Sequence, residues 1–522
     1  MKVRKLCNDR KFHEFIKEER KMTEAKLTRL KYLLNKCLDF FDKYSIYAIA
    51  LVGIIITIFR CIDNNFWGDE SYTILKVMQA ESLKEVATVD LANPPFFFLM
   101  LKLVMLLLGE TAFVYHFASA LPLFIFVIFS LVCLKKEIGK DATTVFLTMV
   151  VLMPSALEYF VEVRMYSWAI LFVCICFYNG YILVKKAGRS VVNWIFMCIG
   201  GVGAAYTHYF AFASIILIYF CVFCRLVMLD KKNIAKCIIA TGISIIVYCP
   251  WLSVFVNAVS SISGDFWIQE TEKLGTFIGY IFQNGILLIV YVTTTVLLII
   301  GEVKDRKYSR TDESLIQIEG SKHVTISAAV WMNLTALYVV IVMWLFQLVY
   351  GKLVGPVFII RYLYPTIVVF WLMLAINIEK LLKGKEKALA VLLLVLLILL
   401  AYAPKDIKNT KLYYEQNRSS KKTVELIEEY DKTEKLVIMT NIQHLNWTVL
   451  DYYFPNIKKD SADFEHSWLS ETTDTAILIL SSYVEHSEEF NQYIEKQGYK
   501  YTFIGVSNIA SYPVYLYEVR KN

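Results

Sequence analysis

Charged side chains are scarce in this sequence. Only 19% of its 522 residues are Asp, Glu, Lys or Arg, whereas 57% are hydrophobic, and the mean hydropathy is +0.50. A soluble protein of this length does not need so much apolar surface, which excludes an ordinary soluble enzyme. The apolar residues recur in runs of the length that spans a bilayer as a helix, so we predict an α-helical polytopic membrane protein.

Cysteine is missing from everything after Cys249. All eleven cysteines lie at or before that position, which excludes disulfide bonds from the C-terminal part of the chain, whatever compartment it occupies. Two close pairs, Cys174 with Cys176 and Cys221 with Cys224, lie in apolar runs without neighbouring His or Cys clusters. This pattern favours packing over metal binding.

A cleavable signal peptide is not expected either, because residues 1–44 are polar and charged throughout. This arm holds 13 Lys or Arg against 7 Asp or Glu, a net charge of +6, whereas the whole chain carries +7. The positive-inside bias therefore predicts that the arm is cytoplasmic. Its charge is explained by topology and a weak attraction to anionic lipid, and nothing in it suggests a nucleic-acid partner.

The apolar runs and the basic loops between them predict about eleven spans, with the N-terminus inside and the C-terminus outside the cell membrane. The short apolar stretch 96–108 is predicted to lie in the outer interface. The reason is that Lys135 and Lys140 should be cytoplasmic, which leaves room for only one crossing after Asp69. The expected spans are 45–62, 112–134, 142–157, 166–184, two crossings within 191–228, 236–252, 276–300, 325–349, 361–379 and 388–403.

The composition changes at Pro404. Residues 404–522 hold 14 Lys or Arg against 18 Asp or Glu, a net charge of −4, opposite in sign to the arm. The pattern predicts a small extracytoplasmic α/β domain. The chain thus divides into a basic arm (1–44), a transmembrane domain (45–403) with an outer loop (63–111), and this domain (404–522). Its expected elements are helix 421–430, strand 436–440, helix 443–453, strand 475–480, helix 483–497 and strands 499–506 and 513–519.

Polar residues gather in five segments that the topology places at the outer face. The adjacent acids Asp69 and Glu70 follow the first span, where carboxylates are costly to desolvate and therefore suggest a function. The other four segments are Asn93-Pro94-Pro95 with Lys102, Glu158 to Tyr166, Thr207-His208-Tyr209-Phe210, and Arg361-Tyr362-Leu363-Tyr364-Pro365.

Taken singly, most of these residues also have a structural explanation. Arg164 and Arg361 suit snorkelling or pairing with Glu162. His208 suits a hydrogen-bonded turn, and Lys102 suits an anchor in the membrane interface. Their collection at one face of the membrane is what favours a site.

The residue types fit the transfer of a group from a lipid phosphate. Arginine binds phosphate oxygens through a planar, bidentate fork. A carboxylate takes the proton of an attacking hydroxyl, and Tyr or Trp at this level stacks on sugars or anchors in the interface. Two adjacent carboxylates would also suit a hard divalent cation, although no closed set of metal ligands is visible in the sequence.

The ordered set of motifs resembles that of the GT-C glycosyltransferases, specifically bacterial proteins related to the dolichyl-phosphate-mannose protein mannosyltransferases (glycosyltransferase family 39). Those proteins carry an Asp-Glu pair, a His-Pro-Pro interfacial helix, a Glu-x-Arg-x-Tyr outer turn and an Arg-Tyr-Leu-x-Pro span start. The matches here are Asp69-Glu70, Asn93-Pro94-Pro95, Glu162-Val163-Arg164-Met165-Tyr166 and Arg361 to Pro365. The resemblance covers about residues 45–380. Asn93 stands where the family has His, and His116 where relatives commonly have Arg.

The resemblance implies an inverting transfer of a sugar from a polyprenyl-phosphate donor in the membrane lipid to a glycan, lipid or protein acceptor at the outer face. It implies Asp69 as the general base with Glu70 in support, and no protein-bound metal is assigned. The donor-binding residues that it implies are Lys102, Glu162, Arg164, Tyr166, His208, Arg361 and Tyr362.

Two other classes of protein stay open: a transporter or flippase of lipid-linked sugars, and a non-catalytic homologue. A transporter should place polar or Gly/Pro-broken positions near mid-span in matching halves. Here the polar residues gather at one face, which favours the enzyme. The presence of Asp69, Arg164 and Arg361 argues against a non-catalytic homologue.

Overall fold

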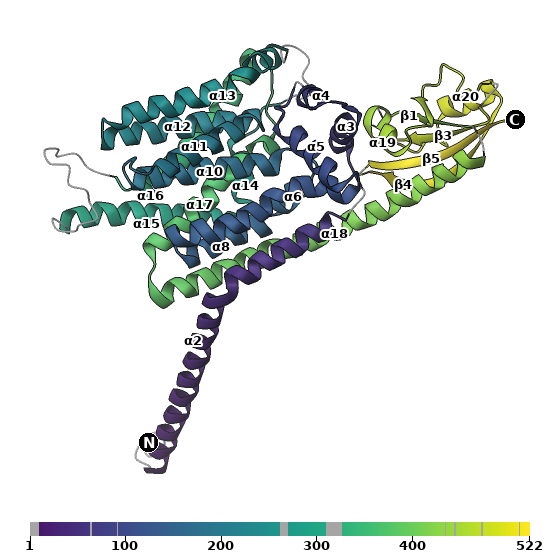
Figure 1. Cartoon of the computed structure of the whole chain (residues 1–522). Coiled ribbons are helices and arrows are strands. Elements are labelled where there is room, and N and C mark those ends of the chain that lie inside the picture. The colour runs from purple at the N-terminus through teal and green to yellow at the C-terminus, as the bar shows by residue number, and fades with distance from the viewer. Residues whose placement is uncertain are drawn as a thin grey trace.

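The computed structural model of the chain describes residues 10–62, 65–90, 92–261, 270–308, 326–433, 435–442, 445–470, 473–510 and 512–522. These residues form a bundle of helices with a small sheet domain at one end (Figure 1). We call the end beside the sheet domain the sheet end. The opposite end is called the basic end, because Lys140, Lys186 and Lys387 lie there.

The segments predicted to span the membrane are helical over most of their described lengths. Within the described ranges, nine helices are long and apolar enough to cross a membrane, which supports the prediction of a polytopic helical protein. They include α2 (Arg10–Arg60), α6 (Ala112–Phe129, continued by η1 and α7 to Ile138), α10 (Tyr166–Lys185), α12 (Tyr209–Leu229), α13 (Asn233–Ser261), α15 (Gly285–Tyr308), α16 (Ala328–Leu353), α17 (Tyr364–Leu381, preceded by the 3-10 turn η2, Ile360–Leu363) and α18 (Gly384–Thr433). The other two predicted spans are the shorter helices α8 (Lys140–Leu152) and α11 (Val191–Ala205).

Two predicted spans are interrupted. The run 142–157 passes at Met153 from α8 to a short helix, α9 (Pro154–Tyr159), because the residue before a proline disfavours the helical conformation. The run 276–300 forms a short helix, α14 (Leu274–Phe282), and then α15. Gln283 separates them in the left-handed conformation (φ 49°), and the side chain of Asn284 accepts a hydrogen bond from the backbone N–H of Ile286. An Asn that caps a new helix start explains the break, which the apolar pattern alone does not reveal.

Helices α10 and α17 form the centre of the bundle. The most apolar windows of these two helices are 94% and 89% buried, against 17% for α13 at the periphery. A helix that is apolar all round is expected to be buried all round. Both central helices begin at the sheet end, and their starts carry Tyr166 and Arg361, so the packing of the core fixes the position of two predicted site residues.

Three short helices cover the sheet end: α3 (Gly68–Gln79), α4 (Leu83–Thr88) and α5 (Phe96–Leu108). Helix α5 has 13 residues, a length of about 20 Å that falls short of the roughly 30 Å hydrocarbon core. Its start is held where the backbone N–H of Phe96 donates to the carbonyl of Tyr206. This length fits the predicted interfacial helix.

The sheet domain is a three-layer α/β unit. Its strands follow the order β2-β1-β3-β5-β4, parallel among β2, β1 and β3 and antiparallel among β3, β5 and β4. Every residue of β1 and β3 is buried, because both faces of the sheet are covered. The strands are β1 (Leu436–Thr440), β2 (Lys458–Ser461), β3 (Thr475–Leu480), β4 (Tyr499–Ile509) and β5 (Tyr512–Lys521).

The two faces of the sheet can be followed in the alternation of side chains. Ile438 and Ile477 belong to a core shared with α18, η3 (Leu445–Val449) and α19 (Leu450–Tyr453). Val437 and Leu478 point to the other core, which α20 (Glu488–Gln497) covers. Each such buried side chain contributes about 1.5–3 kcal/mol. Strand β2 is missing from the prediction because its polar, mostly exposed sequence carries no apolar signal.

Helix α18 joins the two parts without a break. It runs along the bundle and continues beneath the sheet (Figure 1), so the predicted span 388–403 and the predicted helix 421–430 belong to one 50-residue helix. Pro404, where the composition changes, lies inside it. A proline removes one backbone hydrogen bond from a helix but does not always end it.

Candidate active site

The first turn of α3 is the centre of the candidate site. Asp69 and Glu70 lie in this turn, where the partial positive charge of a helix N-terminus stabilises carboxylates. The preceding residue, Gly68, is in close contact with the sheet domain. A Cβ atom there would lie 3.1 Å from the Tyr512 hydroxyl, so the start of α3 and β5 meet at a position that suits glycine.

The Asp69 carboxylate lies between two arginines. Its Oδ2 atom is 3.3 Å from Nη2 of Arg361 and 3.9 Å from Nη2 of Arg164. The Asp69 side chain is 38% exposed and that of Arg164 only 9%. Two guanidinium groups against one carboxylate leave a net positive charge at a point that solvent reaches.

Each arginine is also fixed by a second contact. Nη1 of Arg164 donates to Thr73 Oγ1 at 3.0 Å and lies 3.5 Å from the backbone carbonyl of Asp69. The Arg361 guanidinium lies over the Trp67 ring, 5.3 Å from its centroid, a cation–π contact. Among the described residues, the buried Nε atoms of both arginines have no hydrogen-bond partner. Both side chains thus keep donor capacity beyond what Asp69 uses.

Glu70 has a different task from its neighbour. Its Oε1 accepts the backbone N–H of Val163 at 2.7 Å, and its Oε2 accepts that of Trp67 at 3.2 Å. The second bond is the N3 half of a capping box. Glu70 therefore ties the start of α3 to the 161–165 turn.

The 161–165 turn is also held from α6. His116 Nδ1 lies 2.6 Å from the carbonyl oxygen of Val161, and the His116 ring stacks on Phe66 with 4.8 Å between centroids. This histidine stands where the resembling family commonly has Arg. Here its position serves the turn that carries Glu162 and Arg164.

Glu162 is a buried acid with spare capacity. Burial, together with the nearby Glu158 carboxylate, raises its pKa to about 8, although Arg164 acts in the opposite direction. Its Oε1 atom has no hydrogen-bond partner among the described residues. At neutral pH the Glu162 side chain is therefore largely protonated and able to donate a hydrogen bond.

His208 and Tyr362 form an aromatic wall beside the arginines. His208 is the N-cap of α12 and accepts the backbone N–H of Ala211 through Nδ1. Burial and the charges of Arg164 and Arg361 lower its pKa to about 3, so the ring is neutral. Its ring lies 5.6 Å from Tyr166 and 5.3 Å from Tyr362.

Lys102 is not brought to this cluster. Its Nζ donates to the carbonyls of Val77 and Ala80, each at 3.0 Å. These carbonyls belong to the C-terminal end of the 12-residue helix α3, roughly 12–16 Å along its axis from Asp69. The position of Lys102 suits a cation that caps a helix C-terminus, not a ligand beside Arg164.

A cavity of about 470 Å³ opens beside the cluster, between the bundle and the sheet domain. Predicted site residues in its wall are Glu70, Glu162 and Arg361. Glu158 and Tyr159 belong to the outer segment that the sequence analysis named without giving them a role, and Trp67 precedes α3. The sequence analysis missed the others, because they come from the end of α2, from α18 and from β5. The further wall residues include Arg60, Trp67, Glu158, Tyr159, Asp406, Asn409, Thr410, Tyr413 and Tyr512.

The sheet domain is seated on the same helix start. The backbone N–H of Phe66 donates to the Tyr453 hydroxyl at 3.1 Å, and the Phe66 and Tyr452 rings meet edge to face at 5.3 Å. Arg60, from α2, lies over the Tyr413 ring of α18. The wall of the cavity is therefore built by both parts of the chain.

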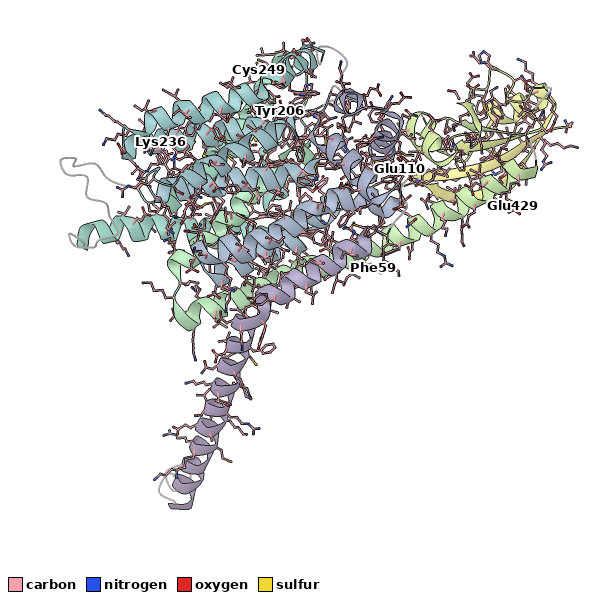
Figure 2. All side chains as sticks on the ribbon, in the orientation of Figure 1. Phe59, Glu110, Tyr206, Lys236, Cys249 and Glu429 are labelled. Carbon is pink, nitrogen blue, oxygen red and sulfur yellow. The ribbon has the colours of Figure 1, made fainter. Side chains whose placement is uncertain are left out.

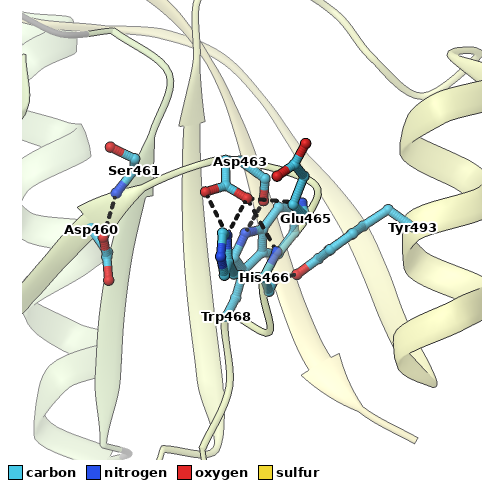
Figure 3. Close-up of polar contacts among 7 residues, drawn as sticks. All are labelled: Asp460, Ser461, Asp463, Glu465, His466, Trp468 and Tyr493. Atoms are coloured by element: carbon cyan, nitrogen blue, oxygen red, sulfur yellow. Dashed lines mark hydrogen bonds and ion pairs between the residues drawn. The ribbon is translucent and has the colours of Figure 1, made fainter.

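A second polar cluster lies in the sheet domain and stabilises a loop there. The Asp463 carboxylate accepts the backbone N–H groups of Glu465 and His466 and pairs with the His466 ring at 2.9 Å (Figure 3). Trp468 Nε1 donates to the Asp463 carbonyl, and the Tyr493 hydroxyl donates to that of His466. These bonds close one exposed loop, and none of them involves a residue of the candidate site.

Within the described ranges, no group of three or more His, Cys, Asp or Glu side chains is placed to hold a metal ion. The two adjacent acids that suited a hard cation turn to different partners. Asp69 faces two arginines, and Glu70 accepts two backbone N–H groups.

The helix bundle, its short helices at the sheet end and the small α/β domain define an α-helical polytopic membrane fold of the GT-C type. Two crystal structures of ArnT from Cupriavidus metallidurans share this fold. The apo state has a TM-score of 0.55 and 11% sequence identity, and the complex with undecaprenyl phosphate has a TM-score of 0.53 and 12% identity. Each match covers 90% of this chain and 97% of the ArnT chain. Neither the family models nor the curated proteins compared with the sequence gave a match.

Proposed function

We propose that the protein is a glycosyltransferase that moves a sugar from a polyprenyl-phosphate donor to an acceptor hydroxyl, with inversion at the anomeric carbon. The observation that carries the proposal is the half-exposed Asp69 carboxylate held between Arg164 and Arg361 at the first turn of α3. The shared fold with ArnT, which was crystallised with undecaprenyl phosphate, supports a polyprenyl phosphate as the lipid part of the donor.

In this proposal the arginines hold the donor phosphate. The donor is a phosphodiester with one negative charge, and the leaving group is a monoester with up to two. The charge on the phosphate therefore grows as the sugar–oxygen bond breaks. Guanidinium groups that are already in place stabilise that growing charge more than the ground state, which is the condition for catalysis.

Asp69 acts as the general base. The acceptor oxygen forms its bond to the anomeric carbon, its proton passes to Asp69, and the electron pair of the broken bond stays with the polyprenyl phosphate. Asp69 shares its arginines with the incoming phosphate, so the carboxylate loses part of its pairing when the donor binds. A less strongly paired carboxylate is the better proton acceptor.

We assign the cavity at the sheet domain to the acceptor. Its wall holds two cations, Arg60 and Arg361, against four carboxyl groups, of which Glu162 is largely protonated at neutral pH. The wall thus has no excess of positive charge, which disfavours a strongly anionic acceptor. Aromatic rings and carboxyl groups together suit neutral polyhydroxylated molecules. The carboxyl groups are Glu70, Glu158, Glu162 and Asp406, and the aromatic residues are Trp67, Tyr159, Tyr413 and Tyr512.

The reaction is tested with purified protein and a panel of polyprenyl-phosphate sugars. One member of the panel should yield free polyprenyl phosphate faster with the protein than without it. No release above background from any member, despite measurable donor binding, would instead favour a transporter or a non-catalytic homologue.

The acceptor assignment has its own test in Thr410, a wall residue on α18. Thr410→Trp fills part of the cavity and leaves Arg164 and Arg361 themselves unchanged. We expect donor binding to be kept and transfer to the acceptor in native membranes to fall. Lys411→Trp, on the exposed side of the same helix, is the matched control. Equal transfer by both variants would place the acceptor elsewhere.

The proposed topology has the arm of residues 1–44 in the cytoplasm and the sheet domain outside. It is tested by labelling intact cells with an impermeant thiol reagent after Cys37, Cys133 and Cys249, the exposed cysteines of the described residues, are changed to Ser. Glu110→Cys should be labelled and Lys186→Cys should not. The reverse pattern would move the site to the cytoplasmic face.

A further inference from the structure

The N-terminal half of α2 leaves the bundle at the basic end. The spanning part of α2 lies alongside α18, but the preceding part turns and runs across the direction of the bundle helices (Figure 1). Leu38 is buried and Phe41 packs against the bundle, whereas residues 20–34 are exposed throughout. The side chains of this part of α2 stand out into open space (Figure 2).

An apolar stripe follows this exposed helix. Leu27, Leu30, Leu34, Cys37 and Phe41 are spaced three and four residues apart, which places them on one face of a helix. Leu30 and Leu34 are 63% and 46% exposed. An exposed apolar stripe of this length marks a surface that meets a partner.

The stripe is wide rather than narrow. Leu33 and Phe40, exposed by 48% and 65%, lie at its edge, one position before Leu34 and Phe41. In a coiled coil these flanking positions usually carry charges that pair across the interface. A broad apolar face with Leu and Phe instead fits a helix that lies in a membrane interface.

The charge of the segment points the same way. Residues 20–44 contain seven Lys or Arg and three Asp or Glu, a net charge of +4. A second copy of the chain would bring two positive segments together, and Leu38 and Phe41 are already engaged with the bundle. An anionic lipid surface attracts such a segment, and the adjacent spanning part of α2 keeps it beside the membrane.

We propose that residues 20–44 form an amphipathic helix that lies on the membrane surface at the basic end and binds anionic lipid. The apolar stripe enters the interface, and the basic side chains contact the lipid phosphates. The partner is the lipid surface itself, so this proposal is independent of the enzymatic reaction.

The test uses the full chain in lipid nanodiscs that hold one copy each, made of phosphatidylcholine with or without phosphatidylglycerol. Amide hydrogen exchange is followed in peptides from residues 20–40. We expect exchange to be slower by about tenfold or more in the anionic discs, since each basic residue near an anionic surface adds about a further fivefold. Leu30→Gln/Leu34→Gln should lose this protection, and Thr28→Gln/Asn35→Gln, on the opposite face, should keep it.

Two results would overturn the proposal. Exchange that is equally fast in both kinds of disc would mean that anionic lipid is not the partner. Protection that occurs only in discs with two copies, whatever their lipid, would identify a second copy of the chain instead. Unchanged exchange in the sheet domain shows that each variant is still folded.

Discussion

The two ends of the helix bundle both bring carboxylates and cations together, but their cations differ in the donors that they leave unused. At the basic end, Lys387 lies between Glu379 and Asp141, at 3.1 and 3.4 Å, and Lys185 and Lys186 both pair with Glu137. At the sheet end, the Asp69 carboxylate lies between Arg164 and Arg361, whose buried Nε atoms have no hydrogen-bond partner among the described residues. These lysines are thus engaged in ion pairs, whereas the two arginines keep donors for a further anion. A run of basic residues in a sequence is therefore a poor guide to where an anion binds.

The largest difference between the two ends is expected when a carboxylate is removed from each, because the sheet end holds the proposed base. Asp69→Asn keeps the shape but cannot accept the proton, so turnover should fall by roughly 10²–10⁴ with donor binding kept. Asp42→Asn removes a carboxylate at the basic end, where Asp42 pairs with Lys140 at 2.7 Å, and should leave turnover near the parental value. Release of polyprenyl phosphate and donor binding are measured for both variants. Near-parental turnover of Asp69→Asn would rule out the base, and loss of donor binding would mean a structural carboxylate.

The next largest effect, on donor affinity, is expected when arginine is replaced by lysine at the sheet end. Arg361→Lys keeps the charge but loses the planar fork, so the dissociation constant of the donor should rise about tenfold or more. Lys387→Arg makes the reverse change at the basic end and should not alter the dissociation constant of the donor. Donor titrations of both variants measure the difference. Equal donor affinity in Arg361→Lys and in the matching Arg164→Lys would remove the phosphate role of the arginines.

The buried carboxyl group of Glu162 should make the stability of the protein depend on pH. Burial raises its pKa to about 8 in the folded protein, above the ordinary carboxyl value near 4.3. Between these values the folded state holds the proton that the unfolded state has lost, so the free energy of unfolding declines as pH rises through this window. The slope is at most about 1.4 kcal/mol per pH unit.

Glu162→Gln cannot ionise and should lose that slope, so it should gain stability relative to the parent as the pH rises from about 5 to about 8. Glu137→Gln, at the half-buried Glu137 of the basic end that pairs with Lys185 and Lys186, should keep the parental slope. Thermal unfolding of the solubilised proteins across this range checks both. A parental slope in Glu162→Gln would show that this carboxyl is ionised in the folded protein.

The smallest effect on turnover is expected from the ion pairs of the basic end. Lys387→Met removes two contacts of a side chain that is 18% exposed and leaves the carboxylates of Asp141 and Glu379, 14% and 26% exposed, without their shared cation, so the protein should lose stability, by about 3–5 kcal/mol at most. The melting temperature should fall, and donor turnover should not change. A large loss of turnover would mean that the basic end acts on the site through the bundle.

Much of the fold follows from the sequence because its signals are local. Long apolar runs specify helices, and the short, nearly continuous apolar runs of β1 and β3 specify strands buried on both faces. The meeting of Asp69, Arg164 and Arg361 also follows, since an ordered topology places the starts of three segments at one face. A break such as that at Gln283, or a polar edge strand such as β2, has no such signal.

The features that could not be predicted from the sequence depend on tertiary packing. Lys102 has the right chemistry and lies on a neighbouring helix, but only the packing of α5 against α3 decides that it reaches the far end of α3. The cavity residues Arg60, Thr410 and Tyr512 come from segments hundreds of residues apart. No periodicity in any one of these segments predicts that they share a wall.

Because helix α18 is unbroken, its length fixes both the rotation and the height of the sheet domain relative to the bundle. Its 50 residues span about 75 Å, with Lys387 near one end. Near the other end, Thr423 bonds to Ser507, and the Ser420 hydroxyl accepts the backbone N–H of Ala510. One residue inserted between Pro404 and Ser420 would turn the sheet domain by about 100° relative to the bundle. Seven residues would nearly restore the angle but lift the domain by about 10 Å. The number of residues in α18 therefore sets the seat of the sheet domain on α3.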